Sequence, residues 1–175
     1  TTLLHRLPPA AFYQGQSFVL DKGQTFDVNN TRLQLENAGY QCVDTVYEHG
    51  EFAVRGSIMD IFPMGQALPF RIELFDDEIE SLRTFDPDTQ RTVYKTSNIR
   101  ILPAREFPLD KSAIRTFKAR WFDFFEQDPK ACSIYTDVTQ GIAPGGIEYY
   151  LPLFFTDPLG SLFDHLPRNT LLIHD

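Results

Sequence analysis

The clearest pattern in the chain is an alternation of two sets of residues between positions 69 and 76. One parity holds Phe70, Ile72 and Leu74, and the other holds Arg71, Glu73 and Phe75. Because successive side chains of a strand point to opposite faces, this run predicts a strand whose first set packs in a core and whose second set faces outward. Residues 76–77 then predict a turn, and residues 79–85 predict the returning strand of a hairpin.

Shorter runs on either side predict the rest of a small sheet. Strands are expected at residues 17–21, 43–47, 91–94 and 99–102. Residues 52–62 form a longer run, in which Arg55 lies on the parity opposite to Phe52 and Val54. Gly56 disturbs the alternation, which favours a bulge or bend within this strand. The pattern predicts five or six short, mostly antiparallel strands.

One short helix is expected beside the sheet, over residues 30–38. Asn29 and Asn30 supply its start, and Gly39 supplies its stop. The fold class predicted from these elements is α+β, a small mostly antiparallel sheet with one or two helices, followed by a mainly helical piece. The expected organisation is a connector over 1–16, a sheet module over 17–103 and a helical part over 104–175.

The character of the chain changes to helix after the predicted sheet. Asp110 is placed to cap a helix over residues 111–126, and a second helix is predicted over 129–140. Residues 141–169 are rich in Gly, Pro and aromatic residues, so they predict an irregular, packed connection. Residues 170–174 predict a buried strand, and its position at the end of the sequence indicates a segment of a longer chain.

Composition and charge narrow the possible functions. The chain has 175 residues, 42% of them hydrophobic, so a substantial core is expected. Its net charge of −8 and pI near 4.9 argue against an autonomous nucleic-acid binder. The two cysteines, Cys42 and Cys132, lack metal-ligand spacing and predict free thiols in the cytoplasm. No apolar run approaches the ~20 residues that cross a bilayer, so no membrane is expected.

The outward parity of the predicted sheet carries the candidate binding residues. Arg55, Arg71 and Phe75 are expected outside the core, and arginine and aromatic side chains dominate protein-binding hot spots. A purely structural alternative remains open, in which Phe75 packs under a loop and Arg55 pairs with Glu51 or Glu73. The residues alone leave both a docking face and this alternative in place.

Catalytic motifs are not found. Asp76, Asp77 and Glu78 are more typical of a solvated turn than of a metal or acid–base site. Ser161 lacks the second glycine of a nucleophile elbow, and no phosphate-binding G-x-x-x-x-G-K-[ST] sequence occurs. The run TLLIHD, ending at Asp175, has the form of a Walker B strand, which is a weak signal alone. We therefore expect no catalytic residue, cofactor or metal ligand in this chain.

Three long motifs resemble a known family. EFAVRGSIMDIFP, PFRIELFDDEIESLRTFDPDTQR and ILPAREF are similar to the region shared by the excision-repair protein UvrB and the transcription-repair coupling factors, called Mfd. VYEHGEFAVRG, IFPMG and GGIEYYLPLFF are closer to the coupling factors. The resemblance extends over nearly the whole chain.

The resemblance implies a function for each part. Residues up to about Leu102 correspond to the module that binds UvrA, and the later residues to part of a degenerate helicase-like lobe. The UvrA contacts would be Arg55 in the F-x-V-R-G motif, Arg71 before I-E-L-F, and Phe75 at the end of that strand. The implied role is non-catalytic recruitment of nucleotide excision repair to RNA polymerase stalled at DNA lesions. ATP, Mg²⁺ and double-stranded DNA would belong to the motor of the parent protein.

Two alternatives of other classes remain at this stage. In the first alternative, the chain is part of UvrB itself, which is a DNA-dependent ATPase. In the second, the chain is a DNA-contacting scaffold. A P-loop upstream of this sequence would favour UvrB, and salt-dependent DNA affinity would favour a scaffold.

Overall fold

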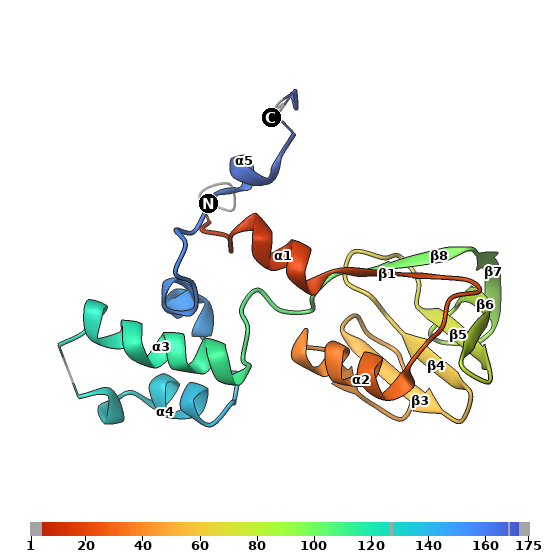
Figure 1. Cartoon of the computed structure of the whole chain (residues 1–175), viewed down its shortest axis with the longest axis horizontal. Coiled ribbons are helices and arrows are strands. Elements are labelled where there is room, and N and C mark those ends of the chain that lie inside the picture. The colour runs from red at the N-terminus through yellow and green to blue at the C-terminus, as the bar shows by residue number, and fades with distance from the viewer. Residues whose placement is uncertain (1–4, 127, 168, 172–175) are drawn as a thin grey trace. The chain divides into compact units, whose positions relative to one another are not determined.

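The computed structural model describes residues 5–126, 128–167 and 169–171 (Figure 1). The chain divides into two compact units, which we call the sheet unit (Gln14–Arg105) and the helical unit (Thr1–Tyr13 with Glu106–Asp175). Within the N-terminal residues, where no element was predicted, α1 (Ala10–Gln16) is helical. The mixture of a small antiparallel sheet and several helices confirms the predicted α+β class.

The sheet unit is built on six strands in the order β2-β3-β4-β5-β6-β7. Their bounds are Gln41–Cys42, Glu51–Arg55, Ile58–Ile61, Phe70–Phe75, Glu78–Phe85 and Thr92–Thr96. The short β2 runs parallel to β3, and all other neighbours are antiparallel. A separate two-stranded ladder joins β1 (Phe18–Asp21) to β8 (Asn98–Ile101). The predicted strand at 99–102 therefore exists, but outside the main sheet.

Two predicted strands were wrong in form. Residues 52–62 are not one bulged strand but a hairpin, in which Arg55 pairs with Ile58 across a two-residue loop. Gly56 has a φ of +61° and Ser57 a negative φ, which is the pattern of a type II′ turn. The sequence disturbance at Gly56 thus marks a reversal of the chain. Residues 43–47 form a loop, since β2 ends at Cys42.

The main core lies on one face of this sheet. Helix α2 (Val28–Asn37) covers that face (Figure 1). Its Leu35 is buried in the same core cluster as the strand residues. Asp27 caps α2 by accepting a hydrogen bond from the amide of Asn30 at 3.0 Å, so the helix begins earlier than predicted. Gly39, with a φ of +95°, follows its end as expected.

The predicted parity of the central strand is confirmed. Phe70, Ile72 and Leu74 of β5 are all buried in the main core. The opposite face carries only a small apolar cluster, formed by Val46, Ala53, Phe62 and Phe85. The loop that contains Val46 covers this cluster, and the rest of the face is lined mainly by polar side chains.

The helical unit contains the predicted helix as α3 (Lys111–Phe124), capped by Asp110, which accepts from the amides of Ser112 and Ala113. The second predicted helix is divided into η2 (Pro129–Ala131) and α4 (Ser133–Thr139), because Cys132 between them is extended. The irregular region contains η3 (Ile147–Phe154) and α5 (Leu162–His165).

The predicted buried strand at 170–174 falls partly outside the described residues. Thr170 and Leu171, its first two positions, are exposed and belong to no strand. Asp175, the expected end of a Walker B-like run, also falls outside the described residues.

Candidate protein-docking face

The polar face of the sheet, opposite α2, brings the candidate residues onto neighbouring strands. Strand register places one row of side chains across this face, consisting of Ala53, Asp60, Arg71, Arg83 and Lys95. The next row consists of Arg55, Ile58, Glu73 and Ser81, and Phe75 follows at the end of β5. We call this set of residues the docking face.

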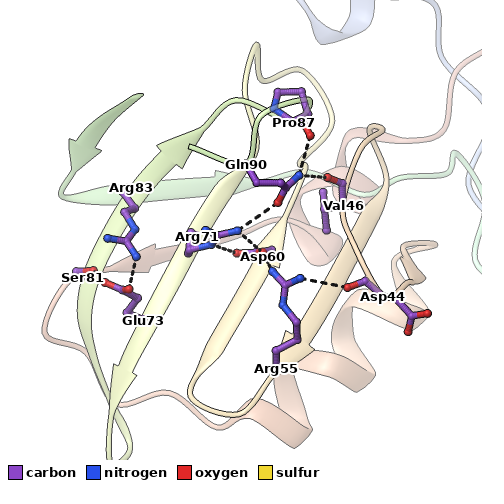
Figure 2. Close-up of polar contacts among 10 residues, drawn as sticks. All are labelled: Asp44, Val46, Arg55, Asp60, Arg71, Glu73, Ser81, Arg83, Pro87 and Gln90. Atoms are coloured by element: carbon purple, nitrogen blue, oxygen red, sulfur yellow. Dashed lines mark hydrogen bonds and ion pairs between the residues drawn. The ribbon is translucent and has the colours of Figure 1, made fainter. Parts of the chain in front are cut away.

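Asp60 lies at the centre of the docking face and is only 1% exposed. Arg71 donates from Nε to Oδ1 of Asp60 at 2.7 Å and from Nη2 to Oδ2 at 2.9 Å. Arg55 also donates from Nη2 to Oδ2 of Asp60. Figure 2 shows the carboxylate between the two guanidinium groups, which come from β3 and β5 on either side of β4. One buried anion therefore holds both candidate arginines.

Two loops add to this network (Figure 2). Gln90 accepts from Nη2 of Arg71 at 3.3 Å, and it donates to the carbonyl oxygens of Val46 and Pro87 at 3.2 and 2.7 Å. The backbone φ of Gln90, +59°, is unusual for a residue other than glycine. Arg55 donates from Nη1 to the carbonyl oxygen of Asp44 at 3.3 Å. The arginines thus connect the sheet to the loops that border the face.

The two arginines differ in their exposure to solvent. The Arg55 side chain is 45% exposed, whereas that of Arg71 is 15% exposed. The Arg71 guanidinium also lies 4.6 Å from the centroid of the Phe85 ring. The hydrogen bond to Asp60 raises the pKa of Arg71 above its ordinary value, so this group remains a cation. Arg71 is mainly an internal cation, and Arg55 is the more accessible one.

A second polar cluster separates this network from Phe75. Glu73 accepts hydrogen bonds from the Ser81 hydroxyl at 2.5 Å and from Nη2 of Arg83 (Figure 2). Both ionic side chains of the pair are partly buried. The cluster keeps Glu73 occupied with Arg83, so Glu73 is not the partner of Arg55.

Phe75 lies fully outside the core. Its side chain is 68% exposed, although its neighbour Leu74 is buried. The expectation of an outward Phe75 is therefore confirmed, and the alternative in which a loop covers it is wrong. The alternative pairing of Arg55 with Glu51 or Glu73 is also wrong, because Arg55 pairs with Asp60.

Sequence reasoning missed two members of this site. Asp60 interrupts an apolar run, between Met59 and Ile61, and an acid in such a position is a usable signal for a buried ion pair. Gln90 follows a turn and carries no comparable signal.

The described residues offer neither a metal site nor a membrane-spanning helix. Among residues 5–126, 128–167 and 169–171, no group of three or more His, Cys, Asp or Glu side chains is arranged to hold a metal ion. The helices described there are too short or too polar to cross a membrane.

Residues 18–107, which include the whole docking face, match the protein family described as the UvrB interaction domain. The chain belongs to this UvrB interaction domain family. It is 50% identical over 175 residues to the transcription-repair-coupling factor of Escherichia coli strain K12 and 47% identical over 176 residues to that of Haemophilus influenzae. The Bacillus subtilis factor is 31% identical over 183 residues.

These alignments cover 99%, 99% and 97% of the chain. They cover only 15%, 15% and 16% of the respective relatives. The chain therefore spans a small part of the length of the coupling factors to which it is similar, and that part contains a UvrB interaction domain.

Proposed function

We propose that this UvrB interaction domain binds UvrA through the docking face and recruits nucleotide excision repair to RNA polymerase stalled at DNA lesions. The observation that carries the proposal is an exposed Phe75 on the same sheet face as two arginines held by one buried carboxylate. Large aromatic and arginine side chains are the residue types that contribute most to protein-binding energy.

Each residue has a distinct role in this proposal. Phe75 fills an apolar pocket on the partner and supplies the buried area. Arg55 donates its accessible N–H groups to a partner carboxylate, since its planar fork suits that geometry. Arg71 adds positive charge to the docking face and, through its bonds to Asp60, stabilises the buried part of that face. Interactions of this kind combine burial from the aromatic with orientation from the charged pairs.

The charge of the docking face supports an acidic partner surface. Its rows contain four basic side chains, Arg55, Arg71, Arg83 and Lys95, and two acidic ones, Asp60 and Glu73. The chain as a whole has a net charge of −8. A locally basic face on an acidic chain favours one orientation of encounter with a partner.

The wider function is also part of the proposal. The chain acts in the cytoplasm as a non-catalytic binding module and needs no cofactor. ATP, Mg²⁺, RNA polymerase and double-stranded DNA are engaged by the longer coupling factor of which such a module forms a part. The 50% and 47% identities to coupling factors favour this role over a segment of the UvrB ATPase.

Calorimetric titration of UvrA with the chain tests the proposal. Phe75→Ala and Arg55→Ala are each expected to weaken binding by about 2 kcal/mol, the scale of a hot-spot residue. Phe122→Ala is the matched control, because Phe122 is similarly exposed, at 64%, but lies in α3. Wild-type affinity in both docking-face variants would contradict the proposal. Binding to duplex DNA with a steep salt dependence and no response to UvrA would favour a DNA scaffold instead.

A further inference from the structure

We propose that Asp60 is a positioning residue, which sets the two docking arginines as a pre-organised pair before the partner arrives. This inference rests on the proposed function, since it assumes that Arg55 and Arg71 serve partner binding. Asp60 itself is too deeply buried, at 1% exposed, to touch the partner.

The carboxylate of Asp60 accepts its side-chain hydrogen bonds from the two docking arginines. Arg71 uses its fork to engage both carboxylate oxygens, and Arg55 shares Oδ2. The carboxylate comes from β4, between the strands that carry the two arginines. A single anion at this position therefore fixes the separation of two cations that belong to different strands.

Two like charges held this close repel each other unless an anion lies between them. Without the Asp60 charge, Arg55 keeps a single hydrogen bond among the described residues, from Nη1 to the carbonyl oxygen of Asp44 at 3.3 Å, and nearly half of its side chain is already exposed, so it turns into solvent more readily. A long side chain that is free before binding loses rotamer freedom when it binds. Asp60 removes part of that loss in advance for Arg55, and it leaves N–H groups of Arg55 accessible to a partner.

A role limited to folding accounts less well for this arrangement than a role in positioning. Replacing a buried ion pair by apolar residues of similar volume is often neutral or stabilising. The same strands already form an apolar core on their other face, through Met59, Ile61 and Ile72. A buried carboxylate bonded to two arginines at a docking surface is instead the arrangement expected where binding geometry has to be fixed.

The first test is UvrA binding by the Asp60→Asn chain, which keeps the side-chain shape and loses its charge. At a temperature where the variant is folded, we expect at least a tenfold loss of affinity. Ile72→Val is the matched control, since it disturbs the sheet from the opposite face at the strand that carries Arg71. This control should bind UvrA as the wild type does.

The double variant Asp60→Asn with Arg55→Ala separates positioning from general destabilisation. If Asp60 acts through Arg55, the combined loss of affinity is smaller than the product of the two single losses. Losses that multiply fully, or an Asp60→Asn chain that binds as tightly as wild type, would overturn the inference. If Arg55→Ala and Phe75→Ala also had no effect, the proposed function itself would fail, so the two failures are distinguishable.

A spectroscopic test needs no partner. In the free wild-type chain, NMR should show separate, slowly exchanging Nη proton signals for Arg55 and Arg71, because Asp60 restrains both guanidinium groups. Averaged signals from Arg55, as for a freely rotating side chain, would refute pre-organisation. In Asp60→Asn we expect the Arg55 signals to average while the backbone spectrum stays dispersed.

Discussion

Arg71 joins both of its fork nitrogens, Nε and Nη2, to the two carboxylate oxygens of Asp60, at 2.7 and 2.9 Å. The pair connects the central strands β4 and β5 across the face that lies opposite the main core. A residue expected from the sequence to contact a partner thus also neutralises a buried charge. Mutations of Arg71 will therefore change stability as well as binding.

Arg71→Ala should destabilise the chain by about 3–5 kcal/mol, the usual result of removing one partner of a buried ion pair. The reason is that Asp60 stays buried with only the more exposed Arg55 to pair with. Urea unfolding measures the loss. Arg32→Ala is the control, because its i,i+4 pair with Glu36 is exposed and should contribute no more than about 0.5 kcal/mol. Equal effects of the two substitutions would show that Asp60 does not depend on Arg71.

Leu74→Ala should lower stability strongly and Phe75→Ala should leave it almost unchanged, although the residues are adjacent. Leu74 is buried in the main core, so its truncation should cost about 2–5 kcal/mol of unfolding free energy. Phe75→Ala should leave stability within about 0.5 kcal/mol of wild type, because the ring is largely exposed. Thermal unfolding compares the two. A neutral Leu74→Ala would mean that the register of β5 is wrong.

Gly56→Ala should lower stability by about 1–2 kcal/mol, because the residue has a φ of +61° that a Cβ disfavours. No atom outside its immediate neighbours lies within 4 Å of a Cβ built there, so the cost is one of backbone conformation and not of crowding. Gly15→Ala is the matched substitution within helix α1, where open space also surrounds the added Cβ. It should raise stability by roughly 0.5–1 kcal/mol. Denaturation midpoints that shift in the same direction for both variants would contradict the hairpin.

Asp86 should make part of the stability depend on acid pH. The backbone amide and the hydroxyl of Thr89 both donate hydrogen bonds to Asp86. These bonds, with the backbone one contributing more, lower the pKa of the Asp86 carboxyl below its ordinary value of 3.8. A lowered folded-state pKa means that the contribution is complete above the unfolded-state pKa and is lost as pH falls through the folded-state value. Unfolding midpoints measured down to low pH should therefore fall less steeply in Asp86→Asn than in wild type. Identical pH profiles would exclude this contribution.

Local patterns were enough to predict several elements correctly. The alternation over residues 69–76 identified the faces of β5, because side-chain direction in a strand depends only on position along that strand. Capping by Asp110 and the apolar spacing that follows it likewise predicted α3. The sequence marks Gly56 as a special position, but a bulge and a tight hairpin produce a similar local disturbance. Only the pairing of Arg55 with Ile58 distinguishes them.

Strand periodicity along the chain places Arg55, Arg71 and Phe75 outside the main core, and the sequence motifs indicate the family. Three features depend on how the chain packs in three dimensions: the two arginines share Asp60, Gln90 bonds Arg71, and the side chain of Phe75 is largely exposed. Strand parity is fixed by local backbone geometry, so it can be read along the chain. Contacts between β3, β4 and β5 depend on register and on how the bordering loops fold, and these are set only when the whole sheet assembles.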